Sequence, residues 1–441
     1  MKTYESKKSS YKYLVEVNER KNIKATEKIS INKEKTYQKH IGFGGAFTES
    51  TCYMLSMISK EERRKVLENY FDNVNGSGYN FCRLHIHSCD FSMSNYEYSR
   101  DKEDKELLNF NISNDLIYII PIIKEAMEIA SEEIIFFASP WSPPSFMKTT
   151  NMMNHGGKLR AEYANMWALY FVKFIKAYED LGIKISGVTV QNEPSACQTW
   201  ESCIYTAEEE RDFVKNHLAP MFKKHNLDTK IIMHDHNRND VFDRMDIAFS
   251  DDEVFKNVWG TGVHWYMSED YENLTKLHEK YPEKHIVFTE GCCAYNEAEG
   301  GFTTGGWENG EQYAYDIINN FNNYVEAFCD WNMVLDEFGG PNHVKNFCDA
   351  PVMIHTDKKI TVYQNSFYYI QHFAKFIKKG YERVDFFKEG KDLHVTAYKG
   401  DNEVVCVLLN KNQYDVNYSI EIEDVIVTNI IPARGIHTVV I

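Results

Sequence analysis

Short apolar runs alternate along most of the chain with longer stretches that have the periodicity of amphipathic helices. Most of these runs are rich in β-branched and aromatic residues, which is typical of strands buried in a parallel sheet. Eight such runs are each followed by a helix-compatible stretch, and they are GFGGAF (42–47), FCRLHI (81–86), EIIFFAS (133–139), ISGVTV (185–190), KIIMH (230–234), VWGTGVHW (258–265), HIVFTE (285–290) and VEAFCDW (325–331). Eight β-then-α units predict an α/β fold built as a (β/α)8 TIM barrel.

Both ends of the chain lack this alternation. Beyond Gly380, turn residues separate the short β-runs DLHVTAYKG, EVVCVLLNKN, NYSIEIEDVIV and IHTVVI. Such runs predict a small antiparallel β-sandwich. The runs YKYLVEV and KISIN near the amino terminus are short β-runs of the same kind. We therefore expect a (β/α)8 barrel over residues 41–380 and one attached β-sandwich domain built from residues 1–40 and 381–441.

The net charge narrows the class of partner. The formal charge is -16 at pH 7, and a surface of that sign repels nucleic acid and anionic membranes. We therefore expect no nucleic-acid partner, whereas a neutral small molecule remains possible. The sequence does not predict an oligomeric state.

Two further features bear on the cellular compartment. The amino terminus, MKTYESKKSS, has lysines but no apolar segment of a secretory signal, and no apolar run approaches the length of a membrane span. The 10 cysteines are scattered and form no CxxC motif, so we expect reduced, mostly buried thiols. These features predict a cytoplasmic protein with no stable membrane insertion.

Two acidic residues stand at the ends of predicted strands. Glu193 lies just beyond ISGVTV and is followed by Pro194, which cannot donate to a ladder, so the fourth strand should end there. Glu290 ends the seventh run. Because the carboxyl ends of barrel strands gather around one site, the two carboxylates are expected to face each other across a pocket. Paired carboxylates of this kind are typical of glycoside hydrolysis.

The alternative interpretation of each glutamate is structural. A single glutamate at a strand end is most often a solvated loop residue or a helix cap, so the prediction depends on the pair. A barrel that binds carbohydrate without hydrolysing it is the alternative from another functional class. The presence of both Glu193 and Glu290 favours an enzyme.

A series of longer motifs adds a family resemblance. In chain order the motifs are GFGGAFTES, RLHIHSCDFS, SPWSPPSFMK, VQNEPSA, VHWY, FTEGC, DWNMVLDEFGGPN and FYYIQHFAKFI. The sequence resembles glycoside hydrolase family 30, the family of the glucosylceramidases. The resemblance implies a (β/α) barrel with an attached β-sandwich and retaining hydrolysis of terminal β-linked glucosides through a covalent glycosyl-enzyme. A β-1,6-glucanase and a β-xylosidase are the alternatives within the family.

The resemblance also implies roles for the two glutamates. Glu193 matches the general acid/base and Glu290 matches the nucleophile. Retention requires carboxyl groups only about 5 to 5.5 Å apart. Glu193 is expected to hold a proton near neutral pH, and Glu290 is expected to be ionised.

Four further residues match motif positions that support this chemistry. Arg83 matches an arginine beside the nucleophile, and a structural ion pair with Asp235 is its alternative role. Tyr266 matches the tyrosine that donates a hydrogen bond to the nucleophile, with His264 near it, although it could also be a core tyrosine. Asn192 matches the residue that reaches the 2-hydroxyl of the sugar.

The pocket for the terminal glucose is implied by four more matches. Asp90, Trp141, Trp331 and Asn346 stand where the family grips this sugar. A carboxylate can accept hydrogen bonds from two vicinal hydroxyls, and an indole offers an apolar platform. Tryptophans are otherwise core residues by default.

Departures from the family pattern concern the choice of substrate. His85, His87 and Cys293 differ from the pattern, and the glycine-rich loop 294–310 is particular to this chain. The aglycone could therefore be a sugar, a phenol or a sphingolipid.

Two pairs of histidines, His85 with His87 and His234 with His236, have a spacing that a metal could use, but a metal site needs more convergent ligands. We expect no cofactor and no metal, and a small carbohydrate or glycoside as the substrate.

Overall fold

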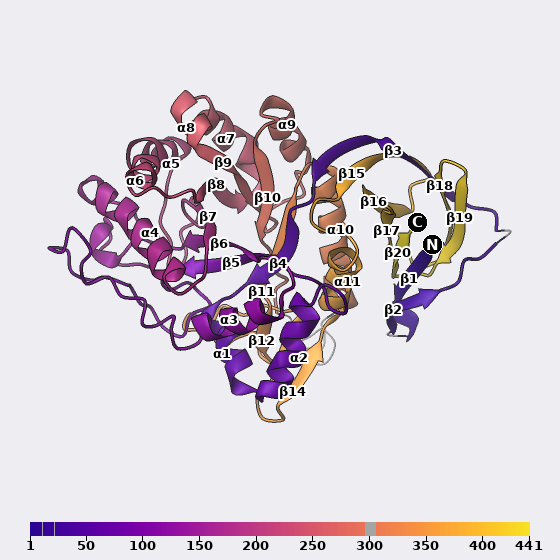
Figure 1. The fold of residues 1–441 in the computed structure, drawn as a ribbon, viewed down its shortest axis with the longest axis horizontal. Helices are drawn as coiled ribbons and strands as arrows, with labels where there is room; N and C mark the ends of the chain where they lie inside the picture. Colours follow the sequence, from indigo (N-terminus) through magenta and orange to yellow (C-terminus); the bar gives the residue numbers. More distant parts are fainter. Residues whose placement is uncertain (11, 22, 296–305) are drawn as a thin grey trace.

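The eight predicted runs form a closed parallel barrel (Figure 1). The structure is a computed structural model that describes residues 1–10, 12–21, 23–295 and 306–441; most of the glycine-rich loop 294–310 lies outside these ranges. The barrel strands, in order around the barrel, are β4 (Gly42–Ala46), β5 (Phe81–Ile86), β6 (Ile135–Pro140), β7 (Ile185–Thr189), β8 (Lys230–Asn237), β9 (Val258–His264), β10 (His285–Glu290) and β11 (Ala327–Asn332). The predicted TIM barrel is confirmed.

Helices surround the barrel on its outer side (Figure 1). They are α1 (Glu49–Met57), α2 (Lys60–Phe71), α3 (Ile119–Ile129), α4 (Ala164–Glu179), α5 (Ala207–Phe213), α6 (Ala219–Lys224), α7 (Val241–Phe249), α8 (Asp252–Asn257), α9 (Glu272–Lys280), α10 (Trp307–Asn322) and α11 (Asn365–Ala374). Side-chain caps start several of them; Thr48 and Ser59, for example, accept backbone N–H groups of α1 and α2. Among the described residues, no helix is both long enough and apolar enough to cross a bilayer.

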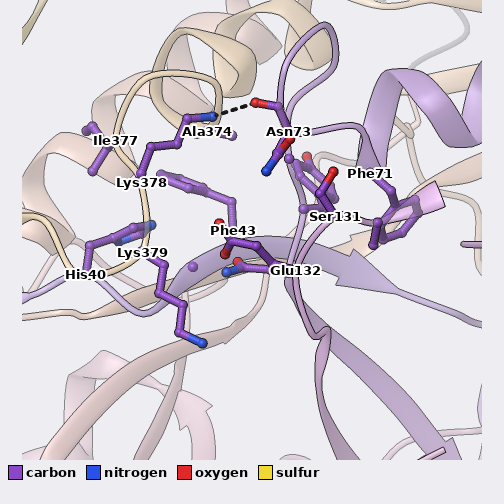
Figure 2. Close-up of a pocket in the computed structure, with 15 residues that line it drawn as sticks. His40, Phe43, Phe71, Asn73, Ser131, Glu132, Ala374, Ile377, Lys378 and Lys379 are labelled. Carbon is purple, nitrogen blue, oxygen red and sulfur yellow. Dashed lines mark hydrogen bonds between the residues drawn. The ribbon is translucent and has the colours of Figure 1, made fainter. Parts of the chain in front are cut away.

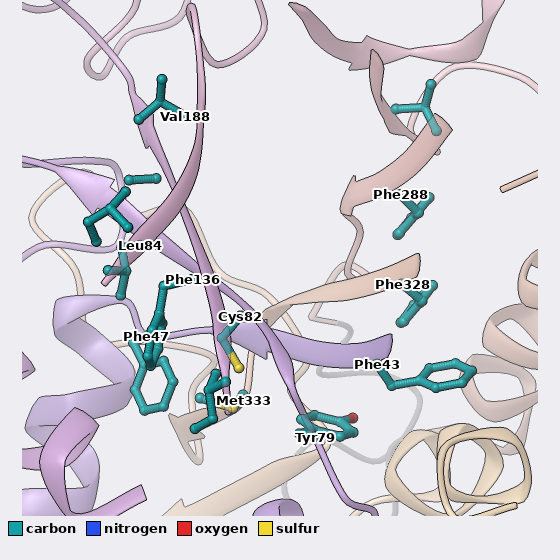
Figure 3. Close-up of a cluster of buried hydrophobic side chains, with 14 of the residues drawn as sticks. Phe43, Phe47, Tyr79, Cys82, Leu84, Phe136, Val188, Phe288, Phe328 and Met333 are labelled. Carbon is teal, nitrogen blue, oxygen red and sulfur yellow. The ribbon is translucent and has the colours of Figure 1, made fainter. Parts of the chain in front are cut away.

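A row of aromatic side chains packs across neighbouring strands of the barrel wall. Phe288, Phe328 and Phe43 are register partners on the neighbouring strands β10, β11 and β4. Figure 3 shows them along one side of the barrel. The rings of Phe288 and Phe328 stack with centroids 4.7 Å apart. Such a row fixes the position of β10, which ends at Glu290, relative to its neighbours β11 and β4.

A nine-stranded sheet combines strands from both ends of the chain and forms the attached β-sandwich. Its order is β19 (Val425–Ile431), β18 (Val416–Ile422), β3 (Glu27–Lys39), β15 (Glu382–Glu389), β16 (Leu393–Lys399), β17 (Val404–Asn410), β20 (Gly435–Val440), β1 (Lys2–Lys7) and β2 (Lys12–Val17). Its pairs are antiparallel except for β18 with β3, which is parallel. Both termini lie in this part, and β3 runs from it to the barrel (Figure 1).

Strand β17 shows how the sandwich attaches to the barrel. Every residue of β17 is buried. Cys406 and Leu408 belong to the core inside the sandwich, whereas Val405 and Val407 belong to the core shared with the barrel. Since successive side chains of a strand point to opposite faces, β17 is covered on both sides. Helices α10 and α11 lie between the two parts and contact this sheet.

Two smaller features complete the fold. A three-stranded sheet of β12 (Val334–Asp336), β13 (Val352–His355) and β14 (Ile360–Tyr363) follows the barrel, and the sequence pattern did not predict it.

A cavity of about 20 Å³ lies at the amino-terminal end of β4, lined among others by His40, Phe43 and Lys378. Figure 2 shows these side chains around it, with Lys378 donating to the carbonyl of Asn73 at 3.2 Å. A cavity of this size can hold one water molecule.

Candidate active site

A cavity of about 580 Å³ opens at the carboxyl ends of the barrel strands. Both candidate catalytic residues and all five candidate sugar-binding residues line it, and these are Glu193, Glu290, Asp90, Trp141, Asn192, Trp331 and Asn346. Tyr266 also lines the cavity, whereas Arg83 and His264 are completely buried beneath it. Residues more than 250 positions apart, such as Asp90 and Asn346, thus meet in one cavity.

Arg83 organises the floor of this cavity. It lies on β5, and its Nη1 donates to Oε2 of Glu290. Its Nη2 donates to Oδ2 of Asp235 at 2.7 Å and to Oδ1 of Asn192 at 2.9 Å, and its Nε donates to Oγ of Ser139 at 3.0 Å. The guanidinium is a fixed cation that two carboxylates share in a region without solvent. The ion pair of Arg83 with Asp235 was one of the two expected roles, and the structure contains both contacts.

Two tryptophans form one wall. The rings of Trp141 and Trp331 stack with centroids 4.9 Å apart and planes 19° apart. The guanidinium carbon of Arg83 lies 4.8 Å from the centroid of Trp141 and 5.4 Å from that of Trp331. The indoles therefore exclude water from the cation while they leave an apolar surface for a sugar ring.

Glu290 has donors for both of its carboxylate oxygens. Arg83 donates to Oε2, and the hydroxyl of Tyr266 donates to Oε1 at 2.9 Å. The same hydroxyl lies 3.5 Å from Sγ of Cys292. Burial raises the pKa of Glu290, and the positive charges of His264 and Arg83 act against that rise. The donors hold the carboxylate in one orientation at the cavity wall.

Glu193 faces two imidazoles. Its Oε1 lies 3.2 Å from Nδ1 of His264 and 3.7 Å from Nδ1 of His236. Its backbone adopts a φ of 48°, which is uncommon for a residue with a side chain, and its N–H donates to the carbonyl of Asp235 at 3.0 Å. Burial alone would raise the pKa of Glu193, but the contacts with His236 and His264 outweigh it and lower the pKa.

The lowered pKa of Glu193 bears on its expected role, because an acid must carry a proton when the leaving group departs. Nε2 of His264 lies 2.9 Å from Oδ1 of Asp235, and an ionised carboxylate needs a donor there. Burial lowers the pKa of His264, but the negative charge of Glu290 and the contacts with Asp235 and Glu193 raise it to about 9. These contacts favour the charged form of the imidazole that faces Glu193.

Asp235 is the residue whose full role the sequence did not predict. Oδ1 accepts from His264 and from Thr289 at 2.6 Å, and Oδ2 accepts from Arg83 and from Thr189 at 2.7 Å. Burial acts to raise its pKa, but these contacts lower it well below the usual range. Asp235 therefore orients both Arg83 and His264.

A bulge in β8 brings Asp235 to this position. The register between β8 and β9 shifts between His234 and His236, and His234 and Asp235 have φ values of 72° and 44°. The two histidines consequently do not point the same way, as simple alternation would require. Nε2 of His234 instead contacts the carbonyl of Asn237 at 2.9 Å, while His236 lines the cavity.

Asp90 presents an unused acceptor to the cavity. Its Oδ2 accepts from Nδ2 of Asn346 at 2.9 Å, whereas Oδ1 is buried and has no hydrogen-bonding partner in the described chain. Burial raises the pKa of Asp90 to about 8, with a further contribution from the charge of Glu290. A ligand hydroxyl is the natural partner for such an atom, because an unpaired buried acceptor costs free energy.

His85 and His87 have structural positions. Nδ1 of His85 contacts the carbonyl of His87 at 2.5 Å, and its Nε2 accepts from the N–H of Glu49 at 3.1 Å. Nδ1 of His87 contacts the hydroxyl of Tyr170 at 2.8 Å. Neither side chain lines the cavity, so the loops that they brace determine the shape of the site indirectly.

Family models match both parts of the chain. The model of the glycosyl hydrolase family 30 TIM-barrel domain matches residues 40–377. The model of the glycosyl hydrolase family 30 beta sandwich domain matches residues 382–439. The strands of the cavity and the sandwich that flanks them therefore have the same arrangement as in this family.

Relatives agree with these matches. The chain is 34% identical to the lysosomal acid glucosylceramidase of Mus musculus over 93% of this chain and 82% of that protein. It is similar to the crystal structure of SrfJ from Salmonella typhimurium, with a TM-score of 0.94 at 30% identity, covering 100% of this chain and 99% of that one. An endo-β-1,6-glucanase structure gives a TM-score of 0.87 at 29% identity, covering 99% and 98%. The chain belongs to glycoside hydrolase family 30 and is a glycoside hydrolase.

Proposed function

We propose that this glycoside hydrolase removes terminal β-linked glucose from its substrates with retention of the anomeric configuration. The observation that carries the proposal is that Glu193 and Glu290 line one cavity together with the unpartnered carboxylate oxygen of Asp90. The first two supply the chemistry of double displacement. The third supplies a recognition point for the outer hydroxyls of one sugar.

In the first step, an oxygen of Glu290 attacks the anomeric carbon and the bond to the leaving oxygen breaks. Arg83 and Tyr266 hold Glu290 in position for this attack. The leaving oxygen takes a proton from Glu193, whose Oε1 lies against Nδ1 of His264. Asn192, which Arg83 orients, reaches the 2-hydroxyl, where a hydrogen bond strengthens as positive charge develops.

In the second step, water attacks the anomeric carbon and releases Glu290. Glu193 is now ionised and accepts a proton from that water, so the pair of Glu193 and His264 returns to its starting state. Each displacement inverts the anomeric centre, and two inversions give retention. The catalytic unit in this proposal is the barrel over residues 41–380, with residues 1–40 and 381–441 as one side domain.

The rim of the cavity bears on the aglycone. Met267, Phe347 and Tyr266 line the cavity with exposed fractions of 71%, 46% and 41%. A rim of exposed apolar side chains favours an apolar aglycone, such as that of an aryl glucoside or of glucosylceramide. The similarity to the endo-β-1,6-glucanase structure supports a β-1,6-linked glucan as the second candidate substrate.

A substrate panel and two variants test the proposal. Aryl β-glucoside should be cleaved faster than aryl β-xyloside, and NMR should show that β-glucose is released first. Glu290→Gln should lower kcat by at least about four orders of magnitude. With azide, a Glu290→Gly variant should give the α-glycosyl azide, and Glu193→Ala should give the β-glycosyl azide from an activated aryl glucoside.

Three results would contradict the proposal. Release of α-glucose first would show inversion. Faster turnover of gentiobiose or of a β-1,6-glucan than of every glucoside would favour the glucanase. Tight binding of glucosides without turnover of any of them would favour a carbohydrate-binding barrel.

A further inference from the structure

We propose that Glu193, His236 and His264 form a binding site for one divalent transition-metal ion, and that an ion bound there blocks glycoside hydrolysis. The inhibitory effect rests on the proposed role of Glu193 as the acid/base, whereas the binding itself does not. The ion in this proposal is an inhibitor and takes no part in catalysis.

The spacing of the three donor atoms supports the site. Oε1 of Glu193 and one nitrogen of each histidine all lie within 4.8 Å of one another. Oε1 is 3.2 Å from Nδ1 of His264 and 3.7 Å from Nδ1 of His236. Tetrahedral Zn²⁺ with bonds of about 2.0 to 2.2 Å needs donors about 3.3 to 3.5 Å apart. The two observed distances lie on either side of that range.

The orientation of His264 also suits a metal ligand. Its Nε2 is 2.9 Å from Oδ1 of Asp235, so the imidazole turns Nδ1 toward Glu193, and a bound ion would displace the proton from that nitrogen. Asp235 is itself fixed by Thr189 and Thr289. Metal-bound histidines in proteins usually donate their second N–H to a carboxylate in this manner, which fixes the tautomer and the ring orientation.

The three ligands lie on neighbouring strands and can be reached from the cavity. They lie at the carboxyl ends of the neighbouring strands β7, β8 and β9. The side chains of Glu193 and His236 are 14% and 13% exposed, and both line the cavity. The fourth position of a tetrahedral ion would therefore face the cavity and take water.

The charge balance of the region favours a dication. The carboxylates of Glu193, Asp235 and Glu290 lie in one hydrogen-bonded network with the guanidinium of Arg83. Once an ion has displaced the proton of His264, Arg83 balances only one of the three carboxylates, and the uncompensated negative charge attracts a cation. Two imidazoles and one carboxylate select zinc-like ions rather than Mg²⁺ or Ca²⁺, which prefer oxygen ligands.

Binding there would stop the proposed reaction directly. An ion on Oε1 of Glu193 occupies the lone pair that must hold and deliver the proton to the leaving oxygen. A competing position for a soft ion lies in the same cavity, because Cys292 lines it and its Sγ is 3.5 Å from the hydroxyl of Tyr266. The experiment must distinguish the two positions.

Titration of Zn²⁺ into the metal-free full chain, followed by calorimetry, gives the binding stoichiometry and Kd. We expect one ion per chain and loss of at least nine-tenths of the aryl-glucosidase activity at saturation, with recovery in EDTA. His236→Ala should weaken binding at least about tenfold. Glu290→Gln should still bind Zn²⁺ even though it is inactive, so a failure of the proposed function does not affect the binding result.

Controls assign the bound ion to its ligands. His217→Ala, on the outer helical layer where His217 contacts Asn165, should leave Kd unchanged. Cys292→Ser should keep both binding and inhibition. The wild-type protein with Co²⁺ should show intense visible bands of a tetrahedral ion without a near-ultraviolet thiolate band, a readout that needs no variant.

Two outcomes would overturn the proposal. One is the absence of Zn²⁺ and Co²⁺ binding to the wild-type chain at millimolar ion. The other is inhibition that disappears in Cys292→Ser, or a thiolate band with Co²⁺, while His236→Ala binds as tightly as the wild type.

Discussion

Arg83 and Glu290 form a buried ion pair across the floor of the cavity, and the same guanidinium binds Asp235 at 2.7 Å. Both side chains of the Arg83–Asp235 pair have no solvent exposure. One cation therefore positions the carboxylate proposed to attack the sugar and the carboxylate that orients His264. A point charge could neutralise these groups, but only a planar fork of donors can reach all of them at once.

The first prediction is that Arg83→Lys damages both activity and stability. An ammonium group cannot replace the separate contacts to Glu290, Asp235 and Asn192, so at least one buried acceptor stays unpaired. We expect kcat/KM for an aryl β-glucoside to fall by about two to three orders of magnitude, and the free energy of unfolding to fall by about 3 kcal/mol. Steady-state kinetics and urea denaturation measure the two effects.

Arg63→Lys is the matched control. Arg63 makes a bidentate contact with Glu125 between outer helices, with both distances at 2.8 Å. This variant should keep full activity. If Arg83→Lys kept kcat/KM within a factor of three of the wild type, the shared guanidinium would not position the nucleophile.

The second prediction concerns the hydroxyl of Tyr266. Tyr266→Phe removes the donor that lies 2.9 Å from Oε1 of Glu290 and leaves the ring in place. We expect kcat to fall by about 10- to 100-fold with a smaller change in KM, because the hydroxyl orients the attacking oxygen rather than the sugar. Tyr315→Phe, whose hydroxyl binds Glu269 away from the cavity, is the control. An unchanged kcat in Tyr266→Phe would assign this hydroxyl to packing alone.

The third prediction tests the sugar pocket. Asp90→Asn replaces one of the carboxyl oxygens that we assign to the outer hydroxyls of glucose, and a buried polar group left without its partner costs about 1 to 3 kcal/mol. We expect kcat/KM for an aryl β-glucoside to fall about 100-fold. The loss for the matching β-xyloside, which lacks the hydroxymethyl group, should be smaller by about a factor of ten. Equal losses on both substrates would mean that Asp90 does not contact that side of the sugar.

The strand ends of this site could be predicted because they depend on local pattern. Glu193 follows a β-run and precedes Pro194, and Glu290 ends another run, so both were expected at one end of the barrel. The eight strands follow from the same alternation. These features can be read from short segments of sequence, because apolar periodicity marks a strand and a proline without an N–H marks its end.

The position of Asp235 could not be predicted in the same way. Regular alternation would place His234 and His236 on one face and Asp235 on the other, but the bulge in β8 breaks that rule. His234 and Asp235 have positive φ values although neither is a glycine. Tertiary contacts maintain this conformation, and they include the four donors around Asp235. No single-sequence pattern contains that information.

The surroundings of Glu193 could not be predicted for a related reason. The family resemblance assigns a role to Glu193 but does not include the distance from Oε1 to His264, which is 3.2 Å. That contact favours the ionised form of Glu193. The small sheet of β12, β13 and β14 was also missed, because strands as short as the three residues of β12 give no periodic signal.

The fourth prediction compares two glycines in the barrel. A Cβ on Gly44 would lie 1.7 Å from the carbonyl oxygen of Phe81 on the next strand, and this backbone atom cannot move without opening the barrel. A Cβ on Gly187 would meet no atom closer than 3.5 Å. We expect Gly44→Ala to lower the free energy of unfolding by more than about 3 kcal/mol or to prevent folding. Gly187→Ala should change it by less than about 1 kcal/mol. Urea denaturation followed by circular dichroism measures both, and similar stabilities of the two variants would contradict the steric clash expected at Gly44.

The fifth prediction concerns acid stability and depends on His40. This side chain is buried against Phe43, Phe321 and Tyr398, and neither ring nitrogen has a hydrogen-bonding partner of good geometry in the described chain. Burial lowers its pKa to about 3, from 6.5 for an exposed histidine, although a nearby carbonyl of Glu326 favours the charged form. Between these two values the unfolded chain binds a proton that the folded chain does not bind, so stability decreases as the pH falls.

His40→Phe should remove this contribution, because a phenyl ring suits the aromatic surroundings and does not titrate. The difference in unfolding free energy between the variant and the wild type should shift in favour of the variant by about 3 kcal/mol between pH 7 and pH 4. The comparison isolates His40 from the other buried histidines, since both proteins share them. If the unfolding free energies of His40→Phe and the wild type changed in parallel with pH, His40 would not lose its affinity for a proton on folding.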